Sequence, residues 1–124
     1  MQIKVSIENG HPIAVVRGAE GEKIIVDTQS ALDFIISIQY AHQTDRIALD
    51  KNAIEDALFI LSTGMAGEIL QKFINYGVKV AIYGDYSHYT SKPLKDFIRE
   101  SNRGNDFFFV PDEIEAVRRL GMVR

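Results

Sequence analysis

The stretch FILSTGMAGEILQKFINYGVKVAIYGD, residues 59–85, decides how this chain folds. Its first apolar run stops at Ser62, and apolar residues then recur with helical spacing as far as Ile74. Gly77 stands where a left-handed residue commonly ends a helix, and the apolar run VKVAIY (78–83) follows at once. A helix that leads into an apolar strand is typical of an α/β protein with parallel strands.

The N-terminal residues predict a β-hairpin. The segment IKVSIE (3–8) alternates apolar and polar residues, and PIAVVRG (12–18) is a second extended segment. Asn9-Gly10 between them is a strong signal for a two-residue hairpin turn. Pro12 has no N–H to donate, so it should lie at the start of its strand or at an edge of the sheet.

Helices and strands alternate along the rest of the chain. Apolar runs predict strands at RIALD (46–50) and DFFFV (106–110), while KNAIEDALFIL (51–61) fits either a helix or a loop with a short turn. The inward faces predicted for the helices contain Leu32, Ile35, Ile36 and Tyr40; Met65, Ile69, Leu70, Phe73 and Ile74; Leu94, Phe97 and Ile98; and Ile114, Val117 and Leu120. Because strands joined through helices pair in parallel, we expect one α/β domain over residues 1–124. It should contain a mixed sheet, made of the N-terminal hairpin and parallel strands, and about four helices.

The composition is that of a globular domain, with 46% hydrophobic and 25% charged residues. There is no cysteine, which excludes disulfides, thiolate metal sites and cysteine nucleophiles. The net charge of −3 and the scattered basic residues argue against a nucleic-acid partner. No apolar run approaches the roughly 20 residues that span a bilayer, and the alternating N-terminus is unlike a signal peptide. We therefore expect a cytoplasmic protein without membrane association.

The first candidate site is the turn Ser62-Thr63-Gly64, at the expected start of a helix. Backbone N–H groups there lack partners, and the helix dipole favours negative charge. A phosphate on either hydroxyl, or an anion approaching the slim glycine turn, would suit this place. The alternative is structural, because a serine or threonine at this position commonly caps the helix.

The second candidate site lies at the carboxyl ends of the predicted parallel strands, where functional groups gather. The loop GDYSHYTSK (84–92) is dense in donors, acceptors and aromatic rings, and such a loop suits a small polar ligand or a partner surface. The candidate binding rim consists of Asp50, Asp85, Tyr86, Ser87, His88, Tyr89, Thr90, Ser91 and Lys92. The alternative is a solvated loop whose Ser91 caps the next helix and whose tyrosines cover the edge of the core.

No catalytic residue, metal site or cofactor is assigned from the sequence. His88 is a general base in principle, but His11 and His42 have neither helical nor metal-ligand spacing to it. The phosphate-binding and dinucleotide-binding motifs, the nucleophile elbow and the zinc-protease motif are all missing. Asp50, Asp85 and Asp112 each follow a predicted strand and could share a divalent cation, although turn chemistry alone produces the same pattern.

The order of elements resembles the STAS domain of bacterial anti-sigma factor antagonists. In that family a D-S-S-G turn opens the corresponding helix, and a serine of the turn is phosphorylated by the partner kinase. Leu61-Ser62-Thr63-Gly64 occupies the matching place, with a leucine where the antagonists have aspartate. The stretch FFFVPDEIEAVRRL (107–120) is similar to the final strand and helix of the family.

An uncharacterised bacterial STAS-like family is a closer match. The stretches ALDK (48–51), TGMAGEILQKF (63–73), GDYSHYTSK (84–92) and ESNRGNDFFFVP (100–111) resemble its motifs. The resemblance implies a STAS-like fold, and no established activity comes with it.

Two functions follow as hypotheses. The first is a non-catalytic regulatory module that binds a protein partner through the rim and is controlled at Ser62 or Thr63. The alternative is a small-ligand-binding protein or small enzyme that uses Asp85, His88 or Lys92 of the loop. An enclosed pocket beside the rim would favour the ligand, whereas a flat rim with exposed aromatic side chains would favour the partner.

Overall fold

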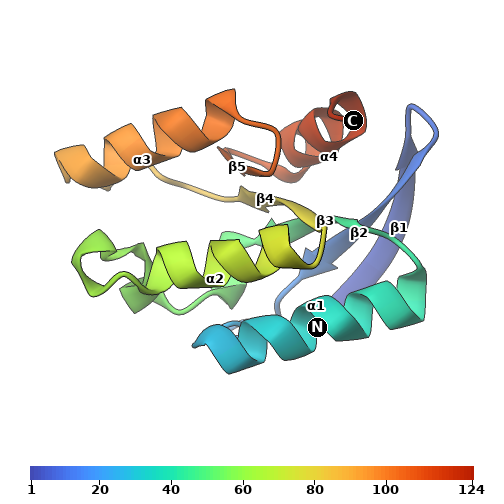
Figure 1. The fold of residues 1–124 in the computed structure, drawn as a ribbon, viewed down its shortest axis with the longest axis horizontal. Helices are drawn as coiled ribbons and strands as arrows, with labels where there is room; N and C mark the ends of the chain where they lie inside the picture. Colours follow the sequence, from blue (N-terminus) through green and yellow to red (C-terminus); the bar gives the residue numbers. More distant parts are fainter.

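Five strands and four α-helices form the computed structural model, which describes residues 1–124 (Figure 1). The elements are β1 (Gln2–Glu8), β2 (His11–Arg17), α1 (Thr28–His42), β3 (Arg46–Asp50), α2 (Met65–Asn75), β4 (Lys79–Tyr83), α3 (Lys92–Arg103), β5 (Phe107–Val110) and α4 (Glu113–Met122). The segment between β3 and α2, which fitted two interpretations, forms three short 3₁₀ turns: η1 (Lys51–Ala53), η2 (Asp56–Phe59) and η3 (Leu61–Thr63). No helix combines the length and the apolar character needed to cross a bilayer.

The strands lie in the sheet in their chain order, β1-β2-β3-β4-β5. The hairpin β1–β2 is antiparallel and turns at Asn9 and Gly10, which both have positive φ. The other three pairings are parallel. The mixed sheet predicted from the sequence is therefore confirmed, and so is the number of helices.

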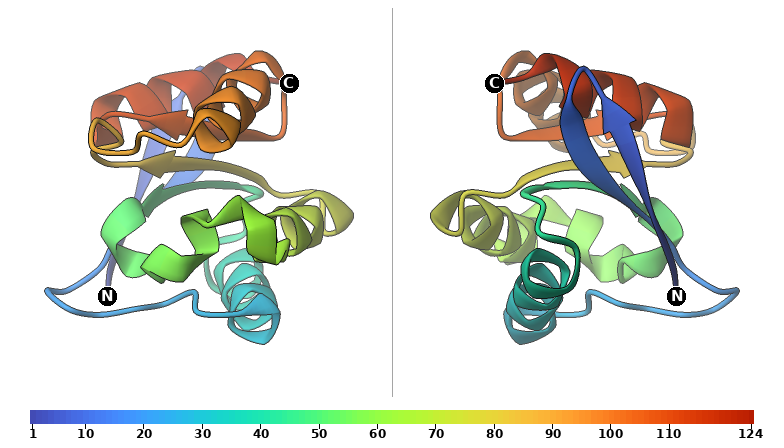
Figure 2. Two further views of the ribbon diagram at one scale, coloured as in Figure 1. Left: turned by 90° about the vertical axis from the view of Figure 1, so that its left-hand side faces the viewer. Right: turned by 90° about the vertical axis from the view of Figure 1, so that its right-hand side faces the viewer.

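Helices cover both faces of the sheet, because the strand residues alternate between the two sides. Ile47 and Leu49 of β3 belong to the larger core cluster, which packs against α1, α2 and α3. Ala48 of the same strand belongs to a smaller cluster that also contains Ala116 and Leu120 of α4. Figure 2 shows α1 and α4 on opposite sides of the sheet.

The helix α2 begins two residues later than the sequence suggests and ends as predicted. Gly64 is its N-cap, has a φ of 74°, and provides no side-chain cap. At the other end Gly77 is left-handed, and Val78 N–H donates to the Phe73 carbonyl at 2.8 Å. Together with the bond from Gly77 N–H to Ile74, this is the hydrogen-bond pattern that glycine commonly provides after a helix.

The predicted inward face of α1 is wrong in part. Its buried residues are Ala31, Phe34, Ile35 and Ile38. Ile36 is exposed and Tyr40 is 85% exposed, since both lie on the side of the helix away from the sheet. The helix carries more apolar residues than one face can bury, so periodicity alone selected the wrong stripe.

The predictions for the C-terminal elements are mostly confirmed. Ser91 caps α3, and Asp112 caps α4 by accepting a bond from Glu115 N–H at 2.8 Å. Of the residues expected to face inward on α4, Leu120 is buried, but Ile114 is 82% exposed. Ile114 is two residues before the buried Ala116, so the helical turn places it on the side of α4 away from the sheet.

Candidate functional site

Successive residues at the end of a strand point to opposite faces of the sheet, so the residues that end β3 and β4 and those that follow lie on different faces. Asp50 pairs in register with Tyr83 at the last position of β3 and β4. Both lie on the α4 side, where the charge of Asp50 contributes to the raised pKa of Tyr83. The next residues, Lys51 and Gly84, lie on the side of α1–α3. Consequently Asp50 does not share a surface with the tyrosine-rich loop, although it was predicted to do so.

Lys51 is the most unusual residue on the α1–α3 side. Only 6% of it is exposed, and its ammonium lies over three aromatic rings. The Nζ atom is 5.3 Å from the ring centroid of Phe59, 5.7 Å from that of Tyr86 and 4.9 Å from that of Tyr89. We call Lys51 and these three rings the aromatic cage. Each contact is within the roughly 6 Å range of a cation–π interaction.

Three separate elements hold the cage in place. Lys51 comes from η1, Phe59 comes from η2, and Tyr86 and Tyr89 come from the loop between β4 and α3. The Tyr86 hydroxyl donates to the Ile82 carbonyl at 2.9 Å, which fixes that ring against the end of β4. Burial raises the pKa of Tyr86, with a further contribution from Tyr89, so the phenol stays neutral.

Gly84 gives the Lys51 side chain its room. A Cβ atom at position 84 would lie 2.7 Å from Cβ of Lys51 and 3.1 Å from its Cδ. Glycine is therefore required for the lysine stem to cross the end of β4 and reach the rings.

The Lys51 ammonium has neither a hydrogen bond nor an ion pair within the chain. Every fully buried polar side-chain atom does have a hydrogen-bond partner, so the unbonded ammonium of Lys51 is not fully buried and solvent reaches it. The Asp85 carboxylate, which the charge of Lys51 influences, accepts a bond from Ser87 N–H at 2.8 Å. Hydrogen bonds from Ser87, with the nearby charges of His88 and Lys51, hold the pKa of Asp85 below its ordinary value.

An open groove of about 410 Å³ runs beside the cage. We call it the rim groove. It is lined by Asp56, Phe59, Ile60, Leu61, Ser62, His88, Tyr89, Thr90, Ser91, Pro93 and Leu94. The two candidate segments of the sequence, the turn before α2 and the loop before α3, therefore face each other across one groove. Phe59 and Tyr89 belong both to the groove and to the cage.

The three residues of the predicted phosphorylation or anion site differ in their roles. The Thr63 hydroxyl donates to the Ile60 carbonyl at 3.0 Å and accepts from Met65 N–H at 3.2 Å. Gly64 provides the left-handed turn into α2. Ser62 is exposed on the groove, and its hydroxyl has no bond to the rest of the chain. Ser62 is thus the free hydroxyl, while Thr63 has the structural role.

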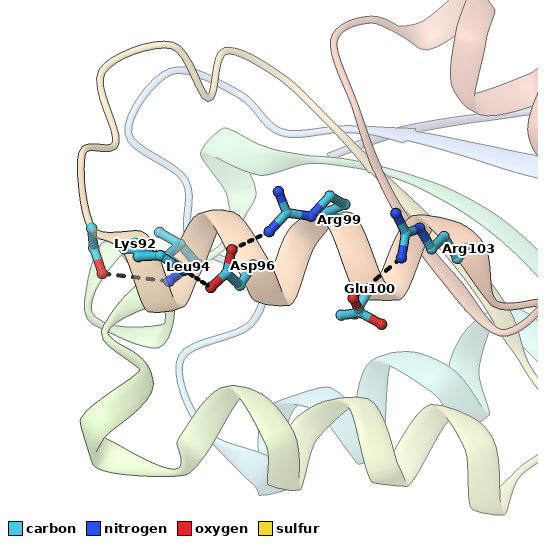
Figure 3. Close-up of polar contacts among 7 residues, drawn as sticks. Lys92, Leu94, Asp96, Arg99, Glu100 and Arg103 are labelled. Atoms are coloured by element: carbon cyan, nitrogen blue, oxygen red, sulfur yellow. Dashed lines mark hydrogen bonds and ion pairs between the residues drawn. The ribbon is translucent and has the colours of Figure 1, made fainter.

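The last residues of the loop serve the helix that follows. Ser91 caps α3, and the Lys92 ammonium lies 2.7 Å from the Asp96 carboxylate. Figure 3 shows the pair of Lys92 with Asp96. The same figure shows that Asp96 also pairs with Arg99, and that Glu100 pairs with Arg103. Lys92 is therefore part of a row of exposed charges on α3, and Lys51 is the unpaired cation next to the groove.

A second polar group lies on the α4 side of the sheet. Arg17 makes a bidentate pair with Glu113, and Lys4 contacts the same carboxylate at 3.1 Å. The Tyr83 hydroxyl donates to the Val16 carbonyl at 2.9 Å. Burial, and then the charges of Asp50 and Glu113, raise the pKa of Tyr83 to about 12. The pairs that Arg17 and Lys4 make with Glu113 join α4 to the hairpin.

The three aspartates that follow strands do not meet. The Asp50 carboxylate accepts from Asn52 N–H, that of Asp85 from Ser87 N–H, and that of Asp112 from Glu115 N–H. No group of three acidic or histidine side chains in the chain is placed to hold a metal ion. Each aspartate stabilises the turn or helix that begins after it, which is the turn-chemistry interpretation.

A small apolar cavity lies under α2 and α3. Its volume is about 30 Å³, and every residue that lines it is hydrophobic. A space of this size holds at most one water molecule, and an apolar wall disfavours even that. Phe59, Leu61 and Leu94 line both this cavity and the rim groove, so they form the wall between the two.

Comparison with protein families decides where the chain belongs. The model of a domain of unknown function, DUF4180, matches residues 8–120. The chain belongs to the DUF4180 family. The expected membership of an uncharacterised family is thus confirmed, and the matched residues include the cage and the rim groove of this DUF4180 domain.

The fold is also similar to a solved structure. That protein, from Thermotoga maritima, is provisionally assigned as an anti-sigma factor antagonist. The two chains are 14% identical, with a TM-score of 0.45, over 95% of this chain and 93% of the other. No curated protein matches the sequence.

Sequence reasoning missed Lys51 and Phe59. The signal for Lys51 was its position directly after the strand RIALD, at the carboxyl end of the sheet. No sequence pattern shows that rings at positions 59, 86 and 89 converge on one ammonium, because the contact depends on how η2 and the loop pack together.

Proposed function

We propose that this DUF4180 domain is a non-catalytic regulatory module that binds a protein partner through the rim groove. The observation that carries the proposal is that the groove is open and is formed jointly by two segments far apart in the sequence. The proposal places the protein in the cytoplasm of a bacterial cell, in keeping with its lack of cysteine.

The lining of the groove suits a short extended segment of a protein. Ile60 is 54% exposed and offers an apolar contact at the mouth of the groove. Ser62, Thr90 and Ser91 add hydroxyl groups around it. A groove that offers both apolar and hydroxyl contacts suits an extended peptide, whose side chains alternate between two sides. The tyrosines contribute less exposed surface than the sequence suggests, because Tyr86 and Tyr89 face the cage.

Control by phosphorylation is assigned to Ser62. Its hydroxyl is free and points to the groove side of η3, whereas the Thr63 hydroxyl is already bonded to the backbone. A phosphate on Ser62 would bring nearly two negative charges to the binding surface. Such a charge changes which partner segments the groove accepts.

Site-specific photocrosslinking tests the partner surface. A photoreactive amino acid is placed at Ser62 or Thr90 inside the groove, or at exposed Glu20 outside it, and the protein is irradiated in its native cells. We expect the same protein to be captured from positions 62 and 90 and not from position 20. Capture of the same set from all three positions, or of nothing from the groove, would contradict the proposal.

Mass spectrometry of the protein from native cells tests the control. We expect phosphate on Ser62 and none on Thr63. If neither hydroxyl is modified under any growth condition, control by phosphorylation is wrong, although a constitutive partner surface would remain.

One observation favours a second function, the binding of a small ligand beside the 84–92 loop. The caged Lys51 ammonium is reached by solvent and is not paired within the chain. A free anion could occupy that place without any protein partner.

A further inference from the structure

We propose that the Lys51 ammonium in the aromatic cage is the centre of a carboxylate-binding site. The inference does not rest on the proposed partner surface, because a small free anion is enough to test it. It concerns a residue on the α1–α3 side of the sheet, reached from the same edge as the rim groove.

The first argument is the unused bonding capacity of the ammonium. A lysine ammonium has three N–H donors, and none of them has an acceptor within the chain. The rings of Phe59, Tyr86 and Tyr89 contact the cation, but they leave these donors without an oxygen atom. Only 6% of the residue is exposed, so the opening through which water reaches the ammonium is small. An anionic oxygen at the solvent opening would restore a charge-assisted hydrogen bond.

The second argument is that a lysine is not needed to fill this space. Burying a charge without a partner is unfavourable, whereas a methionine would fill an aromatic pocket of this size without that penalty. Gly84 is also required for this particular side chain to lie where it does. The structure therefore places an ammonium at a position where packing alone is served better by an apolar side chain.

The third argument concerns the kind of anion. Asp85 lies in the field of Lys51, and its carboxylate stays bonded to Ser87 N–H. This fixed negative charge opposes a dianion more strongly than a monoanion. Since only a small part of Lys51 is exposed, the anion must also be small where it contacts the nitrogen. Both features favour a carboxylate over a phosphate.

A nuclear magnetic resonance titration tests the site directly. The protein is produced with isotope-labelled lysine, and the signals of the lysine ε-methylene groups are followed at neutral pH. Sodium acetate is added in one series and sodium phosphate in another, with sodium chloride keeping the ionic strength constant. We expect acetate to shift the Lys51 signal saturably at millimolar concentration, with a weaker response to phosphate.

Two variants provide the controls. Lys95→Met removes an exposed lysine of α3 that lies outside both the 84–92 loop and the rim groove, and it should leave the acetate response of Lys51 unchanged. Lys51→Met should weaken the acetate response of the Tyr89 ring signals at least about tenfold, as expected for the loss of one charge-assisted hydrogen bond.

Two results would overturn the inference. One is a Lys51 signal that does not saturate, or that moves no more than those of the other lysines, which means adventitious binding only. The other is a stronger response to phosphate than to acetate, which rules out the carboxylate assignment. The wild-type titration decides between these outcomes even if Lys51→Met does not fold. A failed photocrosslink at Ser62 does not affect the result.

Discussion

At the scale of single residues, Gly84 is the position on which the cage depends. An alanine there would place its Cβ 2.7 Å from Cβ of Lys51, too close to the backbone for the flexible end of the side chain to give way. We expect Gly84→Ala to lower the free energy of unfolding by about 1–3 kcal/mol, in the range for an overpacked site. Urea denaturation measures the change.

Gly67 provides the matched control for that substitution. It lies in the first turn of α2, and a Cβ there would meet no atom within 4 Å. Gly67→Ala should raise the free energy of unfolding by roughly 0.5–1 kcal/mol, because it reduces the freedom of the unfolded chain. Equal effects of the two substitutions would show that Lys51 does not lie against Gly84.

The ion pairs of Glu113 should make the free energy of unfolding depend on pH. Partial burial pushes the pKa of Glu113 up, but hydrogen bonds from Arg17 and Lys4 and their charges outweigh it and leave the pKa below the ordinary 4.5. A carboxyl whose pKa is lowered on folding stabilises the protein above its unfolded pKa, and this contribution is lost as the pH falls through the folded pKa.

The variant Glu113→Gln measures that contribution. At neutral pH it should lower the free energy of unfolding by only about 0.5 kcal/mol, since the charges remain accessible to solvent. The difference from the wild type should shrink in denaturation experiments as the pH falls below the ordinary pKa. A difference that stays constant from neutral to acid pH would mean that the ion pair with Arg17 is not the cause.

At the scale of elements, the residues that precede α4 and α2 differ in whether they cap the helix. Asp112 accepts a hydrogen bond from Glu115 N–H and caps α4, whereas Ser62 makes no capping bond to α2. Asp112→Ala should therefore lower the free energy of unfolding by about 1 kcal/mol, while Ser62→Ala should change it by less than about 0.5 kcal/mol. A loss of similar size for Ser62→Ala would show that its hydroxyl is structural, and would weaken its assignment as the free hydroxyl.

The elements also show how far the sequence predicts the fold. Strands and helices were predictable where turn chemistry and apolar runs agree, as at Asn9-Gly10 and Gly77. The buried face of α1 was not predictable, because Ile36 and Tyr40 are apolar but lie on the side away from the sheet. The 3₁₀ turns between β3 and α2 were also not predictable from the sequence, since short turns lack a periodic pattern.

At the scale of the whole molecule, the sheet decides which candidate residues meet. Sequence reasoning placed all the residues that follow strands on one rim, and the rim groove does bring Ser62 to the loop residues His88–Ser91. The pleat nevertheless sends Asp50 to the opposite face, with Tyr83 and Glu113. The groove could be predicted from topology, whereas the cage requires three rings to converge from segments whose packing no local pattern determines.

The most direct test of this account is the position of the Lys51 ε-methylene group relative to the three rings. In the wild-type protein its proton signals should be displaced strongly by the ring currents, with nuclear Overhauser contacts to Phe59, Tyr86 and Tyr89. Signals at the ordinary position of an exposed lysine, without contacts to any of these rings, would show that the cage does not exist and would contradict the account.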